Sequence, residues 1–138
     1  LDEHLTMNSK RLIIGLGQLA AAVTLLGATA LASAQPGDVS QGAALFATHC
    51  AECHSMKEGK NKKGPSLFAT LGSRAGQREG FAYSDALRNS QLVWNAETLS
   101  RYIANPKTTV AGGKMKYEGL AAASERNDLI AYLAHPVQ

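Results

Sequence analysis

Apolar residues recur at helical spacing near both ends of the chain. The first run follows Asp38, which can cap a helix, and continues toward Cys50 through Val39, Ala43, Leu45 and Phe46. Gly42 lies within this run and has no side chain to hold a neighbouring helix away. The run therefore predicts a helix that another helix can approach closely.

A second clear run comes at the end of the chain. Ser124 can serve as its N-cap, Glu125 follows in the first turn and Pro136 lies beyond the end. The apolar positions are Leu129, Ile130, Tyr132 and Leu133. We expect this apolar face to pack against the first helix.

Shorter helices are expected between these two. Ser84 can start one that runs through Ser90, and Asn95 can cap another that ends at Asn105-Pro106. Glycines and Pro65 mark loops elsewhere. No run alternates long enough to predict a strand, so the sequence indicates an all-α fold of three to five helices.

The N-terminal quarter of the chain has the features of an export signal. Lys10-Arg11 precede an uncharged run over residues 12–31, and Ala32-Ser33-Ala34 matches a signal-peptidase site. Residues 1–34 are thus expected to be an upstream extension plus a signal peptide cleaved after Ala34, leaving one domain over residues 35–138. The alternative is an uncleaved anchor, since the apolar run approaches the roughly 20 residues that span a bilayer.

The charge balance argues against nucleic-acid binding. The 138-residue chain carries a net charge of +3, and removing residues 1–34 takes away two basic and two acidic residues, so the balance stays the same. A mildly basic exported protein with two cysteines would ordinarily be expected to form a disulfide.

The spacing of these cysteines indicates different chemistry. Cys50-Ala51-Glu52-Cys53-His54 is a C-x-x-C-H motif, which is typical of covalent attachment of heme c. Residues three apart share one face of a helical turn, so both thiols can reach the two vinyl groups of one porphyrin. His54 is then expected to ligate the iron.

Three other interpretations of the motif remain open: a structural disulfide, a thioredoxin-like redox pair and half of a zinc site. None of them requires the histidine. After removal of the leader, the only histidines are His49, His54 and His135, which leaves a zinc site short of ligands.

The second axial position of the iron needs a residue that can reach the opposite heme face. Met56 and His49 are too close in sequence to His54, whereas Met115 lies far onward in a glycine-rich loop. Met115 could instead pack in a core, as methionine usually does. We expect it to be the sixth ligand, and His/Met ligation favours electron transfer over ligand chemistry.

The ordered motifs resemble class I cytochrome c, close to the bacterial cytochrome c2 and mitochondrial types, over Gly37 to Leu133. The matching pieces are Gly37-Asp38-Val39, Gly42, Phe46, Cys50 to His54, Gly64-Pro65, Gly80-Phe81, Tyr83, Trp94, Asn105-Pro106-Lys107, Lys114-Met115, Glu125-Arg126 and Asp128 to Leu133. The resemblance implies a small cytochrome c fold wrapped around one heme.

The resemblance also implies roles for four further residues. The Pro65 carbonyl would orient the His54 ring, Tyr83 and Trp94 would bond a buried heme propionate, and Tyr102 would pack on the Met115 side. The sequence departs from the family pattern at Gly113, where a threonine is usual, and at Leu87, where an asparagine is common. Ser73 stands where an arginine often meets the propionates, with Arg74 beside it.

Seven lysines flank the expected heme edge: Lys57, Lys60, Lys62, Lys63, Lys107, Lys114 and Lys116. They would steer the protein onto acidic surfaces of redox partners, or else form an ordinary solvated surface. The sequence thus predicts a monomeric periplasmic carrier of single electrons, without catalysis, between a cytochrome complex or dehydrogenase and a terminal oxidase, reductase or photosynthetic reaction center. The alternatives are a membrane-tethered relay and a ligand-binding heme enzyme or sensor.

Overall fold

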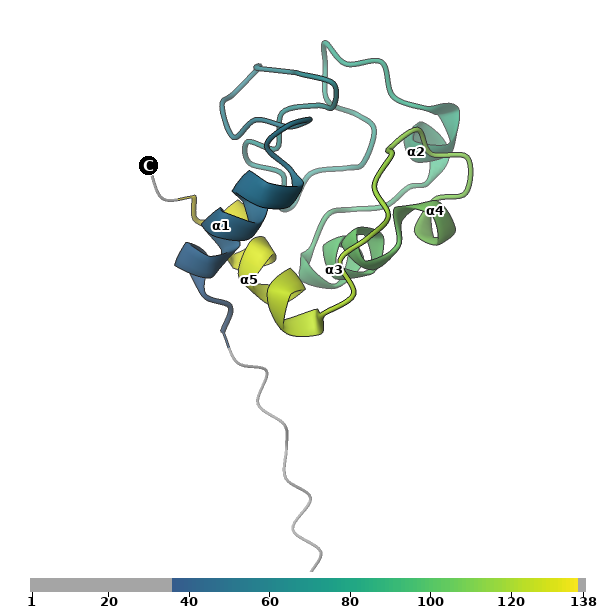
Figure 1. The fold of residues 1–138 in the computed structure, drawn as a ribbon. Coiled ribbons are helices and arrows are strands. Elements are labelled where there is room, and N and C mark those ends of the chain that lie inside the picture. The colour runs from purple at the N-terminus through teal and green to yellow at the C-terminus, as the bar shows by residue number, and fades with distance from the viewer. Residues whose placement is uncertain (1–35, 137–138) are drawn as a thin grey trace, which may run out of the picture. The chain divides into compact units, whose positions relative to one another are not determined.

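The computed structural model describes residues 36–136, which form five helices (Figure 1). They are α1 (Val39–His49), α2 (Asp85–Asn89), α3 (Ala96–Ala104), α4 (Pro106–Thr109) and α5 (Ala123–Ala134). Within these residues, extended pairing is limited to an isolated bridge between Arg74 and Val93. The all-α expectation is confirmed, while the expected leader and its cleavage site lie outside the described residues.

The start of α1 is tied to α5. The Asp38 carboxylate accepts hydrogen bonds from the backbone N–H groups of Ser40 and Gln41 at 2.8 and 3.0 Å, as an N-cap does. The Asp38 N–H donates in turn to the Asp128 carboxylate at 2.8 Å. Figure 1 shows α1 and α5 packed against each other, and this confirms the expected contact between the first and last helices.

The start of α5 differs from the expectation. The helix begins at Ala123 after Ala122, so Ser124 lies in the first turn and is not the N-cap. Arg126 holds the preceding segment instead, because its guanidinium donates to the carbonyls of Leu120 and Ala121 at 2.8 and 2.5 Å. No side chain caps α5, and its first turn is exposed.

The middle helices follow their capping residues. Ser84 caps α2 by accepting from the Leu87 N–H, and Asn95 and Thr98 form a reciprocal capping box at the start of α3. Asn105 ends α3 as expected, but it also caps α4, a short helix that the sequence did not predict. Proline at the first position of α4 has no N–H to leave unpaired there.

The buried core joins α1, α3 and α5. Its members include Phe46, Trp94, Leu99, Tyr102, Ile103, Leu129, Ile130 and Leu133. Among residues 36–136, no helix is long and apolar enough to cross a membrane. The core leaves a large cavity between the C-terminal end of α1 and the loops on either side of α3.

Candidate functional site

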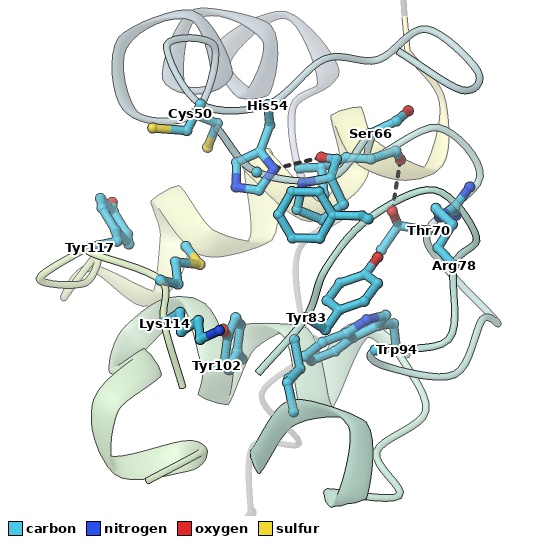
Figure 2. Close-up of a pocket in the computed structure, with 18 of the residues that line it drawn as sticks. Cys50, His54, Ser66, Thr70, Arg78, Tyr83, Trp94, Tyr102, Lys114 and Tyr117 are labelled. Carbon is cyan, nitrogen blue, oxygen red and sulfur yellow. Dashed lines mark hydrogen bonds between the residues drawn. The ribbon is translucent and has the colours of Figure 1, made fainter. Parts of the chain in front are cut away.

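The cavity has a volume of about 780 Å³, within the range of cofactor sites. Cys50, Cys53, His54, Pro65, Tyr83, Trp94, Tyr102 and Met115 all line it, so the structure brings together every site residue expected from the sequence. Figure 2 shows Cys50 and His54 on one side of the pocket, and Lys114 and Tyr102 on the opposite side. Apolar side chains, among them Leu67, Leu99, Ile103, Leu129 and Leu133, form much of the remaining wall.

The C-x-x-C-H motif occupies a single turn just beyond α1. Cys50 is the C-cap of that helix, and its carbonyl accepts from the N–H groups of Cys53 and His54 at 3.0 and 2.8 Å. This turn keeps both thiols and the imidazole at the same cavity. The arrangement is the one expected if the two cysteines and His54 act on one ligand.

The His54 ring has a defined orientation. Its Nδ1 lies 2.8 Å from the Pro65 carbonyl oxygen. A carbonyl can only accept, so Nδ1 carries the proton and Nε2 keeps its lone pair. Burial lowers the pKa of His54, against the opposing effect of the bond to Pro65, and this favours the neutral imidazole that metals bind.

Gly64 leaves room for this ring. A Cβ at Gly64 would lie 2.4 Å from Cε1 of His54, closer than any real contact. The Gly64 N–H also donates to the Cys53 carbonyl at 2.8 Å, which brings the loop back against the motif. The Ser66 N–H donates to the Asn61 side chain at 2.9 Å, so Pro65 is held from both sides.

The segment that carries Met115 is anchored at both ends. Before it, the Gly113 N–H donates to the Val110 carbonyl at 3.0 Å. After it, the Leu120 N–H donates to the Ile103 carbonyl at 3.0 Å, and a Cβ at Gly119 would lie 2.1 Å from the Ala104 carbonyl oxygen. The loop therefore lies against the C-terminal end of α3, with Met115 on the cavity wall.

Aromatic side chains form another wall. The rings of Trp94 and Tyr102 are 5.0 Å apart between centroids, and Tyr83 packs edge-on against Phe81 at 4.9 Å. The backbone of Trp94 is bonded to Gly72 and Ser73, which directs the indole into the pocket. Burial raises the pKa of both Tyr83 and Tyr102, so their hydroxyls are donors at neutral pH.

The cysteines show no sign of the competing chemistries. Cys50 and Cys53 form no disulfide, and burial together with the neighbouring Cys53 raises the pKa of the Cys50 thiol to about 11. A reactive redox cysteine instead has a lowered pKa. Within residues 36–136, no group of three or more His, Cys, Asp or Glu side chains could hold a metal ion, so a zinc site lacks its ligands.

Comparisons with known proteins identify the family. The family model described as cytochrome c matches residues 39–135. The chain belongs to the cytochrome c family. It is 48% identical over 98 residues to a cytochrome c of Gibberella zeae, covering 70% of this chain and 92% of that protein. It is also 46% identical over 98 residues to a cytochrome c of Stellaria longipes, covering 70% of this chain and 91% of that protein.

Membership in the cytochrome c family confirms that the cofactor is heme c and that the general activity is electron transfer. Cytochromes c are electron carriers and not enzymes, and the Cys50 and Cys53 pair attaches heme c covalently. The pocket of this chain fits that group, because Gly64 leaves space for an imidazole that presents a free Nε2. The rest of the cavity is lined largely by apolar side chains, as a porphyrin requires.

Several pocket residues were not anticipated from the sequence. Ser66 and Thr70 are buried there, with hydroxyls that donate to the carbonyls of Lys57 and Leu67 at 2.6 and 2.8 Å. Arg78 also lines the pocket. Isolated hydroxyl and arginine residues in loops carry no periodic signal, so only the three-dimensional structure brings them to the site.

Proposed function

We propose that this cytochrome c carries single electrons outside the cytoplasm, with the heme iron ligated by His54 and Met115. The observation that supports this most directly is the bond from His54 Nδ1 to the Pro65 carbonyl, 2.8 Å long, together with Met115 on the same cavity. Heme iron cycles between ferric and ferrous states, taking one electron from a donor and passing it to an acceptor with no transfer of atoms.

Each proposed ligand has a distinct effect. The Pro65 carbonyl fixes the His54 ring and raises its donor strength. The Met115 thioether is neutral and soft, so as an iron ligand it would favour the ferrous state and would leave no site for small ligands. An iron with no free coordination site suits electron transfer, because neither the ferric nor the ferrous form needs to bind or release a substrate.

The lysines support transient docking. All seven are exposed, and Lys63, Lys114 and Lys116 line the cavity itself. Two of the seven meet carboxylates of this chain: Lys63 pairs with Glu52, and Lys107 pairs with Glu118 at 2.7 Å. Positive charge around the cavity opening would speed encounters with acidic partners. Ion pairs formed there with a partner would be exposed to solvent and therefore weak, so the complex would dissociate easily.

The proposed compartment rests on the sequence motif at the N-terminus, and the proposed partners rest on the resemblance to electron-carrying cytochromes c. If residues 1–34 are removed, the protein is a periplasmic, monomeric shuttle from a quinol-oxidising cytochrome complex or a dehydrogenase to a terminal oxidase, reductase or reaction center. If the leader is retained, the same domain is a tethered relay. N-terminal sequencing of the protein isolated from its host separates the two, because a shuttle begins at Gln35.

Replacement of Met115 tests the proposed ligation. We expect Met115→Ala to retain covalent heme, to bind carbon monoxide in the ferrous state and to have a lower reduction potential. Met56→Ala is the matched control, since Met56 is partly buried and also lies in a loop. A folded Met115→Ala protein with unchanged potential and no carbon monoxide binding would refute the assignment.

A further inference from the structure

Heme c brings two carboxylates into this protein, and the pocket must accommodate any that is buried. A buried carboxylate without a partner is strongly unfavourable, so hydrogen-bond donors or a cation are needed beside it. Tyr83 and Trp94 are the expected donors. The cation is missing from its usual position, because Ser73 stands there and its hydroxyl already donates to the Thr70 carbonyl at 2.6 Å.

Two arginines on this side of the pocket could supply the charge. Arg74 and Arg78 both line the cavity, but Arg74 is exposed whereas Arg78 is half-buried. The backbone of Arg74 pairs with Val93 in the isolated bridge. Figure 2 shows Arg78 on the same side of the pocket as Thr70, Tyr83 and Trp94. Position and burial therefore favour Arg78.

The guanidinium of Arg78 also has donors to spare. Its Nη2 donates to the Ala69 carbonyl at 3.1 Å, and within residues 36–136 it takes part in no ion pair. A guanidinium has five N–H groups, so several remain for a carboxylate. Its charge lowers the pKa of Tyr83, opposing the larger effect of burial, so the two side chains are within electrostatic reach.

We propose that Arg78 binds a heme propionate beside Tyr83 and Trp94, replacing the arginine that position 73 lacks. Arginine is suited to this contact because its planar fork meets a carboxylate with two parallel hydrogen bonds. The charged groups nearest to Arg78 in sequence are Arg74 and Glu79, and both are exposed. Arg78 therefore keeps the propionate ionised across neutral pH.

The test compares holoproteins of the wild type, Arg78→Gln, Arg78→Lys and Arg74→Gln. The reduction potential is measured from mildly acidic to mildly alkaline pH, and redox-difference infrared spectra are searched for a protonated carboxylic acid. In Arg78→Gln we expect the potential to fall with pH and the acid band to appear. The wild type and Arg74→Gln should show neither, and Arg78→Lys should recover most of the wild-type profile.

Two outcomes would overturn the proposal: a pH profile of Arg78→Gln that matches the wild type, or a pH dependence that appears in Arg74→Gln instead. If Arg78→Gln does not mature, the wild-type holoprotein labelled with ¹⁵N-arginine supplies the answer. The Arg78 guanidinium should exchange its protons more slowly than exposed Arg101 and shift between the two redox states. Equal exchange rates and no redox shift would rule out the contact.

Discussion

Gly42 of α1 lies directly against the backbone of Asp128 in α5. A Cβ at Gly42 would come within 2.0 Å of the Asp128 carbonyl oxygen and 2.7 Å of the Tyr132 Cβ. The two helices therefore cross at backbone contact distance. This crossing joins the start of the domain to its end, and the C-terminal end of α1 carries the cysteine motif.

Gly42→Ala is predicted to destabilise the protein by about 1–3 kcal/mol, because the added methyl group must separate the helices. In an exposed helix position the same change would stabilise by up to about 1 kcal/mol, so the sign is diagnostic. Denaturant unfolding of the holoprotein measures the effect. Ala47→Ser, on the exposed face of α1, is the control. A stabilised Gly42→Ala protein would show that the contact is not tight.

Gly64→Ala is predicted to displace the His54 imidazole, since the new Cβ would lie 2.4 Å from the ring. We expect a lower yield of holoprotein, an altered heme absorption spectrum and a changed reduction potential. Gly59→Ala is the control, because a Cβ at this loop position would meet nothing within 4 Å. Equal spectra for the two variants would mean that Gly64 has no special relation to His54.

The lysines at the pocket mouth are predicted to govern reactions with charged partners. The double variant Lys114→Gln and Lys116→Gln should be oxidised several-fold more slowly by ferricyanide and faster by a cationic cobalt complex at low salt. High salt should remove both effects. Arg101→Gln, a charge change on α3 away from the pocket lining, should alter neither rate comparably. Rates independent of reagent charge would count against docking by these lysines.

Tyr102 is predicted to make the protein less stable at alkaline pH. Burial raises its pKa, so as pH rises past about 10 the unfolded state loses this proton before the folded state does. The stability present at neutral pH is then progressively lost. Tyr102→Phe should lose less free energy of unfolding than the wild type between neutral and alkaline pH. Parallel losses in the two proteins would exclude a contribution from this phenol.

The sequence predicted the helices best where local signals agreed. Asp38, Ser84 and Asn95 each cap a helix as expected, because their side chains bond the nearest free N–H groups. Ser124 had the same signal, but α5 begins at Ala123 while Arg126 holds the carbonyls before it. The contact between the Arg126 guanidinium and these carbonyls has no recognisable sequence pattern, so it could not be predicted.

The pocket was predictable where one motif carries the chemistry. Cys50, Cys53 and His54 lie within five residues of sequence, and their spacing predicts the attachment site. Position 64 requires glycine because the ring of His54, ten residues earlier, lies against it. The position of Arg78 depends on a hydrogen bond from its guanidinium to the Ala69 carbonyl in another loop. Contacts between loops depend on the whole fold, which is why sequence patterns did not reveal them.

Met115 is proposed to hold the heme iron together with His54. The most direct measurement is the far-red absorption of the oxidised wild-type protein, where an iron–thioether bond produces a weak charge-transfer band, recorded before and after addition of imidazole. We predict that the band is present, resists displacement by imidazole and is absent in Met115→Ala but not in Met56→Ala. A wild-type protein without the band, or a band that survives in Met115→Ala, would contradict the account.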